Sequence, residues 1–488
     1  MAIDERGKSK LLFSVAAPEL PAVMETADTA QDQESHSNKQ MAADPLARVD
    51  ALALDLPALY RATIASDFFR KVTETYLTQI SLIVVGLATT VVVARILGPE
   101  GRGFLAVAVA LSGLGIQFGN LGLNASNTYY VAKDRSLLPK LLGNTLVISL
   151  GLIGIGAFTA YLFLQGRPQW TPVHGNLLIL VLAWVPFGLA YMLLQNLLLG
   201  VQEVRAYNKI ELVSKLLALV LIGFVLLSGL ASPVTVFLAF FVALLISFVW
   251  AFWRLYGLLH QPPAVSVELF WSNVRLGIKA YLICLFGFMV LKSDILLIKH
   301  FVGVEDAGYY SVATAVSGYL ATLPIVVAAI LFPTLSAMTK VEEKLRMAKR
   351  AAMGTGALLG LLLLFASFSA KLIVRVLFGK AFLPAATAFI WLAPGALFLG
   401  VEAVIVQFLN SFGYPKSIVG VWFAVVVLNV GANLIAIPRY GIVGAAAVSS
   451  LSYLVVLLAI LGLVRGHSSK GSPVPAESQL MQPEVRSL

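Results

Sequence analysis

Twelve long apolar segments dominate this sequence of 488 residues and constrain its fold more than any other feature. A helix needs about 20 predominantly apolar residues to cross the roughly 30 Å hydrocarbon core of a bilayer. Only 12% of the residues are charged, about half of the roughly 25% that is typical of soluble domains. The sequence therefore predicts an all-α membrane protein. The segments that we expect to cross the bilayer are 72–93, 104–126, 141–164, 176–199, 208–229, 234–257, 277–299, 308–336, 352–375, 384–411, 417–437 and 442–464.

These segments divide the chain into four predicted parts. Residues 1–65 are polar, acidic in patches and interrupted by prolines, which is typical of a disordered tail. Residues 66–260 and 261–465 each hold six apolar segments and are predicted to form two six-helix bundles. Residues 466–488 read as a second disordered tail. An even number of crossings places both tails on the same side of the membrane.

The basic residues indicate which side that is. Cytoplasmic connections of membrane proteins carry an excess of lysine and arginine. With both tails inside, nineteen basic residues fall on the cytoplasmic side and eight on the other. We therefore expect a multi-pass protein of the inner (plasma) membrane with both termini in the cytoplasm. The eight residues assigned to external connections are Arg95, Arg102, Arg167, Lys299, Lys371, Arg375, Lys380 and Arg439.

The sequence lacks the motifs that are typical of several classes of active site and metal site. A single cysteine, Cys284, excludes an intrachain disulfide, and the five histidines are scattered without ligand spacing. There is no phosphate-binding glycine loop and no nucleophile–histidine–acid arrangement on a sizeable soluble segment. The formal charge of +10 is explained by the basic cytoplasmic connections rather than by nucleic acid. We expect no enzymatic activity, no cofactor, no metal site and no nucleic-acid partner.

An internal repeat is the most informative pattern. The stretch GPEGRGFLAVAVALSG from Gly98 matches GVEDAGYYSVATAVSG from Gly303 at eight of sixteen positions. Apolar bias explains matched valines and alanines, but not two glycines five residues apart, a shared glutamate and a Ser-Gly pair. Each copy joins the first and second apolar segments of its half, so the two halves are predicted to be parallel repeats. Parallel repeats around a midplane cavity are a common transporter architecture.

Three stretches carry a resemblance to a known family. They are ILGPEGRGFLAVAVA, KSDILLIKHFVGVEDAGYYSVATAVSGYL and LNSFGYPKSIVGVWFAVVVLNVGANLIAIPRYGIVGAAAVSSLSYL. Over roughly 72–464 the chain resembles the polysaccharide-biosynthesis transporters, which are O-antigen-type flippases related to lipid II flippases and to multidrug and toxin extruders. The resemblance implies translocation of an undecaprenyl-diphosphate-linked oligosaccharide by alternating access. It also implies membrane lipid, glycosyltransferases and a polysaccharide polymerase as partners. A proton, a sodium ion or downstream consumption of the product are the candidate driving forces.

Two charged residues lie inside the seventh apolar segment. A charged residue at the bilayer centre costs about 2.5–3.5 kcal/mol on insertion scales, so such residues usually face a cavity or a partner. Lys292 and Asp294 point about 200° apart on a helix, so we expect Lys292 to face a central cavity and Asp294 a neighbouring helix or the other half. The family resemblance carries Asp294 over as a motif position. A buried pairing with other helices, without a ligand role, is the alternative for both.

Amides and one glutamate complete the predicted cavity. Gln117, Asn120 and Asn124 form a stripe on the second segment that suits water or sugar hydroxyls, although amides also join helices within membranes. The tenth segment offers Glu402, Gln407 and Asn410 over a wider arc, and Glu402 is either a proton or cation site or a structural carboxylate. The predicted substrate-binding residues are Lys292, Asp294, Gln117, Asn120, Asn124, Glu402, Gln407 and Asn410.

Two other functions compete with a flippase. A cation-coupled exporter of small organic cations would need an acidic cavity around Asp294 and Glu402, with basic residues facing elsewhere. A non-transporting scaffold for glycan assembly would need no accessible cavity.

A further pair of opposite charge, Glu211 and Lys215, is interpreted as a local ion pair at helical spacing.

Overall fold

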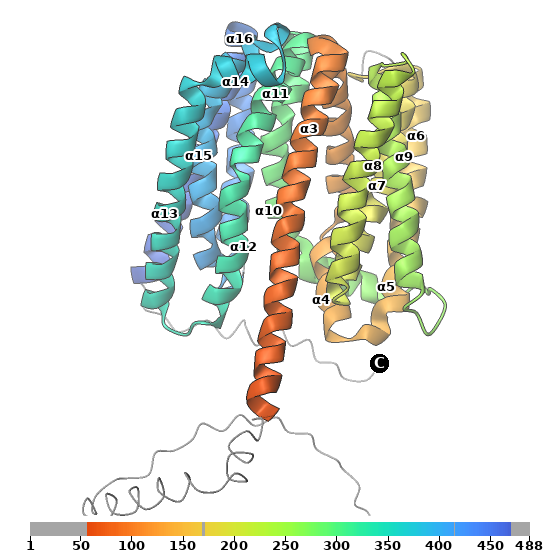
Figure 1. Ribbon diagram of the computed structural model, residues 1–488, viewed down its shortest axis with the longest axis vertical. Coiled ribbons are helices and arrows are strands. Elements are labelled where there is room, and N and C mark those ends of the chain that lie inside the picture. The colour runs from red at the N-terminus through yellow and green to blue at the C-terminus, as the bar shows by residue number, and fades with distance from the viewer. Residues whose placement is uncertain (1–55, 168–170, 414, 470–488) are drawn as a thin grey trace, which may run out of the picture. The chain divides into compact units, whose positions relative to one another are not determined.

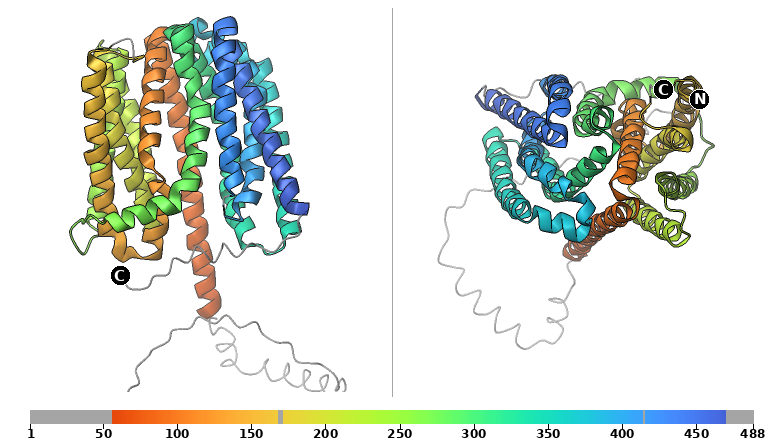
Figure 2. Two further views of the ribbon diagram at one scale, coloured as in Figure 1. Left: turned by 180° about the vertical axis from the view of Figure 1, so that it is seen from behind. Right: turned by 90° about the horizontal axis from the view of Figure 1, so that it is seen from above.

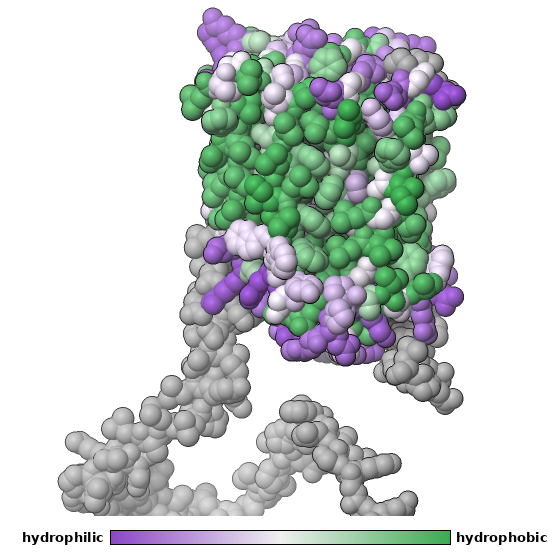
Figure 3. All heavy atoms as spheres, turned by 90° about the vertical axis from the view of Figure 1, so that its right-hand side faces the viewer, coloured by the Kyte–Doolittle hydropathy of each residue, from purple (hydrophilic) through white to green (hydrophobic). Residues whose placement is uncertain are grey.

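The computed structural model describes residues 56–167, 171–413 and 415–469, and every regular element within these ranges is a helix (Figure 1). The helices from Thr73 onward form one compact unit. On the face drawn in Figure 3, a broad belt of apolar side chains lies between two polar ends. Because a bilayer core offers no partners for backbone polar groups, helices that satisfy their own hydrogen bonds are the expected solution. The chain is a multi-pass membrane protein.

The first half begins with the long helix α3 (Leu56–Asn120), whose helical path is interrupted at Gly98. Its other elements are α4 (Leu123–Lys133), η1 (Arg135–Leu137), α5 (Leu138–Leu146), the π-helical η2 (Val147–Ile153), α6 (Gly154–Gln165), α7 (Gly175–Gly200), α8 (Val204–Leu227) and α9 (Pro233–Tyr256).

The second half begins with α10. The first turns of this helix run across one end of the bundle, and the remainder runs along the bundle (Figure 2). Its elements are α10 (Val267–Phe301), α11 (Val304–Leu320), α12 (Thr322–Ala337), α13 (Val341–Phe368), α14 (Ala370–Leu377), η4 (Lys380–Phe382), α15 (Pro384–Asn410) and α16 (Lys416–Ser469).

The predicted count of about twelve crossings agrees with the structure. Nine helices in the described ranges are long and apolar enough to span a membrane, and the pair α11–α12, bent by 40°, makes ten. Two of the nine, within α3 and α16, are 43 and 51 residues long and change direction at Gly98 and Gly441. Each supplies two crossings, which gives twelve.

Local sequence explains where the helices begin and turn. Ser232 and Thr235 form a capping box at the start of α9, with Pro233 in its first turn, where a missing backbone N–H costs nothing. Gly98 and Gly441 have φ angles of 65° and 57°, a region that favours glycine because it has no Cβ. These glycines let the chain turn at the membrane surface without a long loop.

One predicted helix is interrupted. The second crossing, predicted as continuous over 104–126, ends at Asn120, and α4 starts at Leu123. Leu121 and Gly122 between them have φ angles of 49° and 86°. At this break the chain comes so close to α10 that a Cβ on Gly122 would lie 2.7 Å from the backbone of Gly277. The break therefore accompanies a close approach of two backbones from opposite halves.

Other boundaries differ by about one turn or more. The segment predicted over 352–375 is divided, because α13 ends at Phe368 and α14 is a separate short helix. Residues 56–65 of the predicted first tail and 466–469 of the second are helical, in α3 and α16. The remaining parts of both predicted tails lie outside the described residues.

The internal repeat is visible in three dimensions. Gly98 and Gly303, which are equivalent, both have positive φ and both stand where one crossing passes to the next. Gly103 and Gly308, also equivalent, touch the opposite copy. A Cβ on Gly103 would lie 1.8 Å from the carbonyl oxygen of Val304, and one on Gly308 would lie 2.0 Å from that of Pro99. Equivalent points can meet only near the axis that relates the two copies, so this contact marks the axis.

Candidate functional site: a cationic cavity between the halves

A cavity of about 530 Å³ lies between the two halves. Its walls come from both crossings of α3, from Phe240 on α9, from α10 and α11, and from Thr322 at the start of α12. The lining residues are Gln79, Leu82, Ile83, Arg102, Leu105, Ala106, Val109, Ala110, Phe240, Lys292, Ile295, Ser311, Thr314, Ala315, Gly318, Tyr319 and Thr322. Two of them are basic and none is acidic, so the central cavity is cationic.

Lys292 is the one predicted site residue that lines this cavity. It comes from α10 in the second half, one turn before the lining residue Ile295. Its ammonium group is a compact point charge on a flexible stem. Lys299, seven residues further along the same helix, is not among the lining residues.

Arg102 supplies the second positive charge and was missed by the sequence interpretation. The charge count placed Arg102 in an external connection, which is wrong, because α3 resumes at Pro99 and Arg102 lies in its next turn. Its Nε donates to Ser311 Oγ at 3.2 Å across the two halves. Two signals could have identified it. Proline favours the first helical turn, and Arg102 has the helical spacing of the lining residues 105, 106 and 109.

Hydrogen bonds also join the two halves outside the cavity lining, and one of them includes the lining residue Tyr319. Thr90 on α3 and Tyr319 on α11 lie 2.9 Å apart through their hydroxyl oxygens. Arg95 donates from Nε to the carbonyl of Leu377 at 2.7 Å and from Nη2 to that of Val376. These carbonyls end α14, where a cation also compensates the negative end of the helix dipole. Together with the glycine contact, these bonds hold the halves together at the Gly98 end.

Asp294 has a different environment from Lys292, as the angle between them on the helix predicts. It is buried, and its carboxylate accepts hydrogen bonds from Tyr310 at 2.7 Å, Ser449 at 2.5 Å and Asn433 at 3.0 Å. Asn433 also donates to Asn429 at 3.3 Å. The hydrogen-bonded cluster around Asp294 thus joins α10, α11 and α16 inside the second half. Asp294 is not among the residues that line the central cavity.

The predicted amide stripe on the second segment is not continuous. The break at Leu121 and Gly122 separates Asn120, which is buried, from Asn124, which is half-buried. Asn120 Oδ1 accepts from the backbone N–H of Asn124 at 3.1 Å. Gln117 is half-buried, and its Oε1 has no hydrogen-bond partner among the described residues. None of these three amides is among the lining residues of the central cavity, so a role in substrate binding stays a prediction.

The polar residues of the tenth segment also lie away from this cavity. Glu402 is buried on α15, and no hydrogen bond to it is found within the described ranges. Gln407 and Asn410 are half-buried and bond to each other at 3.2 Å. Among the described residues no cluster of histidine, cysteine, aspartate and glutamate could hold a metal ion.

Comparison with solved structures identifies the fold. The chain is similar to the lipid II flippase MurJ in an inward closed conformation, with a TM-score of 0.65 and 14% identity, over 80% of this chain and 87% of that one. It is also similar to an inward-facing multidrug resistance transporter of the MATE family and the MOP superfamily, with a TM-score of 0.66 and 14% identity, over 80% and 96% of the two chains. The predicted architecture of about twelve helices is thereby confirmed.

Sequence comparison identifies the family. An uncharacterized membrane protein of Methanocaldococcus jannaschii is 25% identical over 167 residues, which is 33% of each chain. The chain therefore spans about a third of the length of this curated relative. The family described as polysaccharide biosynthesis protein matches residues 69–339, more than half of the chain and including both copies of the internal repeat. This chain therefore belongs to the polysaccharide biosynthesis protein family, as its resemblance in sequence predicts.

Proposed function

We propose that this protein is a flippase that moves an undecaprenyl-diphosphate-linked oligosaccharide across the inner membrane, for the synthesis of cell-surface polysaccharide. The observation that carries this proposal is the central cavity, which has one basic side chain from each half, Arg102 and Lys292, and no acidic lining residue. A diphosphate linkage is the charged part of such a lipid, and it needs compensating cations wherever water is scarce.

The two basic residues suit a diphosphate in different ways. Arginine presents a planar fork of donors that matches phosphate oxygens, and lysine adds a mobile point charge. The prenyl tail stays in the bilayer, since removing it from hydrocarbon costs about 0.8 kcal/mol per CH₂ group. Only the head group would pass between the halves, and rocking of one parallel repeat against the other would expose it on alternate sides.

The same cavity weighs against the two competing functions. An exporter of organic cations needs acidic groups at the binding site, but Asp294 and Glu402 lie away from the cavity, whereas Arg102 and Lys292 line it. A scaffold needs no cavity of this kind. The fold shared with a lipid II flippase and a multidrug transporter is compatible with transport of either type of substrate, so the charge of the cavity is the distinguishing feature.

Orientation and partners follow from the same proposal. The end of the bundle that holds Lys133 faces the cytoplasm, because the basic connections gather there. Glycosyltransferases would build the lipid-linked glycan on that side, and a polymerase would consume it on the other. Either a proton or a sodium ion would couple transport to an ion gradient, with the buried carboxylates Asp294 and Glu402 as candidate sites.

A translocation assay tests the proposal. The full chain is reconstituted in vesicles with lipid-linked oligosaccharide extracted from its native host, and head groups that reach the opposite leaflet are counted. We expect Arg102→Gln and Lys292→Gln each to slow translocation about tenfold or more, since a charge-assisted hydrogen bond is worth about 1.5–3 kcal/mol.

The matched control is Lys299→Gln, which removes the same charge from the same helix but away from the cavity. We expect it to keep nearly full activity. If the unmodified protein moves no head groups, the flippase proposal is wrong. If translocation is equally slow in Lys299→Gln and Lys292→Gln, the cavity has no special role in binding the diphosphate.

A further inference from the structure

A second, smaller chamber of about 210 Å³ lies inside the first half. It is formed by α7, α8 and α9 together with Ile116 on α3. Phe240 on α9 lines both this chamber and the central cavity, so a single aromatic side chain borders the two spaces. The two spaces are therefore adjacent, and the Phe240 side chain stands between a molecule in the central cavity and the smaller chamber.

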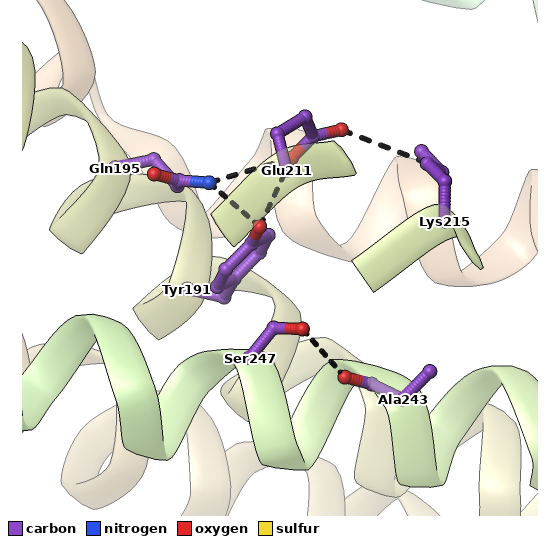
Figure 4. Close-up of polar contacts among 6 residues, drawn as sticks. All are labelled: Tyr191, Gln195, Glu211, Lys215, Ala243 and Ser247. Carbon is purple, nitrogen blue, oxygen red and sulfur yellow. Dashed lines mark hydrogen bonds and ion pairs between the residues drawn. The ribbon is translucent and has the colours of Figure 1, made fainter. Parts of the chain in front are cut away.

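The chamber has a polar centre built around Glu211 on α8 (Figure 4). Glu211 Oε2 accepts from the Tyr191 hydroxyl at 2.9 Å and from Gln195 Nε2 at 3.4 Å. The predicted local ion pair is present, but Lys215 Nζ is 3.8 Å from Glu211 Oε1 and half of its side chain is exposed. The interpretation as an ion pair alone was incomplete, because two residues of α7 also hold this carboxylate in place.

Two acceptor atoms of this cluster have spare capacity, and the one that belongs to a lining residue of the chamber is Glu211 Oε1. Gln195 is 5% exposed, and its Oε1 is buried without a hydrogen-bond partner among the described residues. Glu211 Oε1 forms an ion pair with Lys215 at the long distance of 3.8 Å. A carboxylate oxygen can accept two hydrogen bonds, so a ligand in the chamber that donates a hydrogen bond to Glu211 Oε1 would be stabilised here.

The walls of the chamber are aromatic. Trp184, Tyr191 and Phe240 line it, and the Trp184 ring is fixed by Phe237, whose centroid lies 5.1 Å away, and by Phe241 at 6.1 Å. Rigid aromatic faces with a few fixed polar groups are typical of small-ligand sites. A sugar ring combines an apolar C–H face with hydroxyl donors at its edge, which matches both features. A volume equal to about seven waters at roughly 30 Å³ each suits a single ring.

We propose that this chamber binds one sugar ring of the carried glycan, while Arg102 and Lys292 bind the diphosphate. This inference rests on the proposed flippase function and deepens it, because it separates recognition of the sugar from recognition of the lipid diphosphate. Glu211 accepts hydrogen bonds from the sugar hydroxyls, and Tyr191 and Gln195 position the carboxylate. The aromatic walls contact the face of the ring.

Binding of two lipids to the purified full-length protein tests this inference. The probes are the lipid-linked oligosaccharide extracted from the native host and undecaprenyl diphosphate, which has no sugar. We expect Glu211→Ala to weaken binding of the oligosaccharide lipid about tenfold, or about 1.4 kcal/mol, and to change binding of undecaprenyl diphosphate less than twofold. Arg102→Gln should weaken binding of both lipids.

Two further variants keep the test decisive. Tyr191→Phe removes one hydroxyl that holds Glu211 and should give a smaller loss that is again confined to the oligosaccharide lipid. Val220→Ala, on the outer face of the same helix α8, should change neither affinity. Equal weakening of both lipids by Glu211→Ala, or no weakening of either, would overturn the sugar site. Failure of the unmodified protein to bind either lipid would instead overturn the flippase proposal.

Discussion

Asp294 and Lys292 stand two residues apart on α10, yet each is surrounded by a different part of the molecule. Lys292 lines the cavity between the halves, and Asp294 is held by three donors inside the second half. A buried carboxylate is stable only when its lone pairs are satisfied. The donors Tyr310, Ser449 and Asn433 meet that requirement from two other helices.

The Asp294 cluster should therefore contribute strongly to stability. We expect Asp294→Asn to lower the free energy of unfolding by about 1.5–3 kcal/mol, because it removes the charge that strengthens these hydrogen bonds. Thermal unfolding of the purified protein in detergent would measure the change. Asp306→Asn, in the first turn of α11, is the matched control, and an equal shift for both variants would contradict this role.

At this scale the sequence predicted the angle between Lys292 and Asp294 but not the partners of either. Helical periodicity determines directions around one helix, whereas partners such as Ser449 lie 155 positions away in the chain. Arg102 was missed because the turn before it was interpreted as a longer loop. The short turn at Gly98 and Pro99 places it inside a helix instead.

At the scale of elements, the two copies of the internal repeat meet in a close backbone contact at Gly103 and Gly308. Gly103 and Gly308 leave no room for a Cβ, because the nearest carbonyl oxygens of the opposite copy would be 1.8 and 2.0 Å away. The repeat predicted that the two turns are equivalent. It could not predict that they touch, since sequence similarity does not place the axis between two copies.

Alanine at either glycine should force the halves apart at the Gly98 end. We expect Gly103→Ala and Gly308→Ala each to destabilise this conformation by at least about 1–3 kcal/mol, the usual cost of overpacking, and to lower the unfolding temperature. Gly354→Ala is the control, because a Cβ there meets nothing within 4 Å, and alanine favours a helix over glycine. Indistinguishable unfolding curves for Gly103→Ala and Gly354→Ala would argue against the contact.

The break between α3 and α4 shows what periodicity cannot reveal. The apolar pattern continues through Leu121, a residue type that rarely adopts a φ of 49°. The reason lies in the second half, where Gly277 approaches Gly122. Helix boundaries that depend on contact with a distant segment are therefore the part of this fold that could not be predicted from the sequence.

At the scale of the whole molecule, the twelve crossings and the bias of basic residues predict a definite orientation. α3 enters the bundle and α16 leaves it at the same end (Figures 1 and 2). Ser136 and Ser228 are both exposed, and they lie at opposite ends of the bundle. These two serines are suitable reporters of orientation.

Cysteine labelling would test this orientation. In a Cys284→Ser background, we expect a membrane-impermeant maleimide to label Ser228→Cys in intact spheroplasts. Ser136→Cys should be labelled only after permeabilisation, because its connection carries Lys133 and Arg135 and should lie in the cytoplasm. The reverse pattern of labelling would show that the protein is inserted with the opposite orientation.

The origin of the two cavity charges has a consequence for the release of cargo. Arg102 is carried by the first half and Lys292 by the second, so any movement that parts the halves also lengthens the distance between the cations. Attraction to an anion shared by both falls with that distance. Under the proposed function, affinity for the diphosphate would be highest when the halves are together and would fall as they separate.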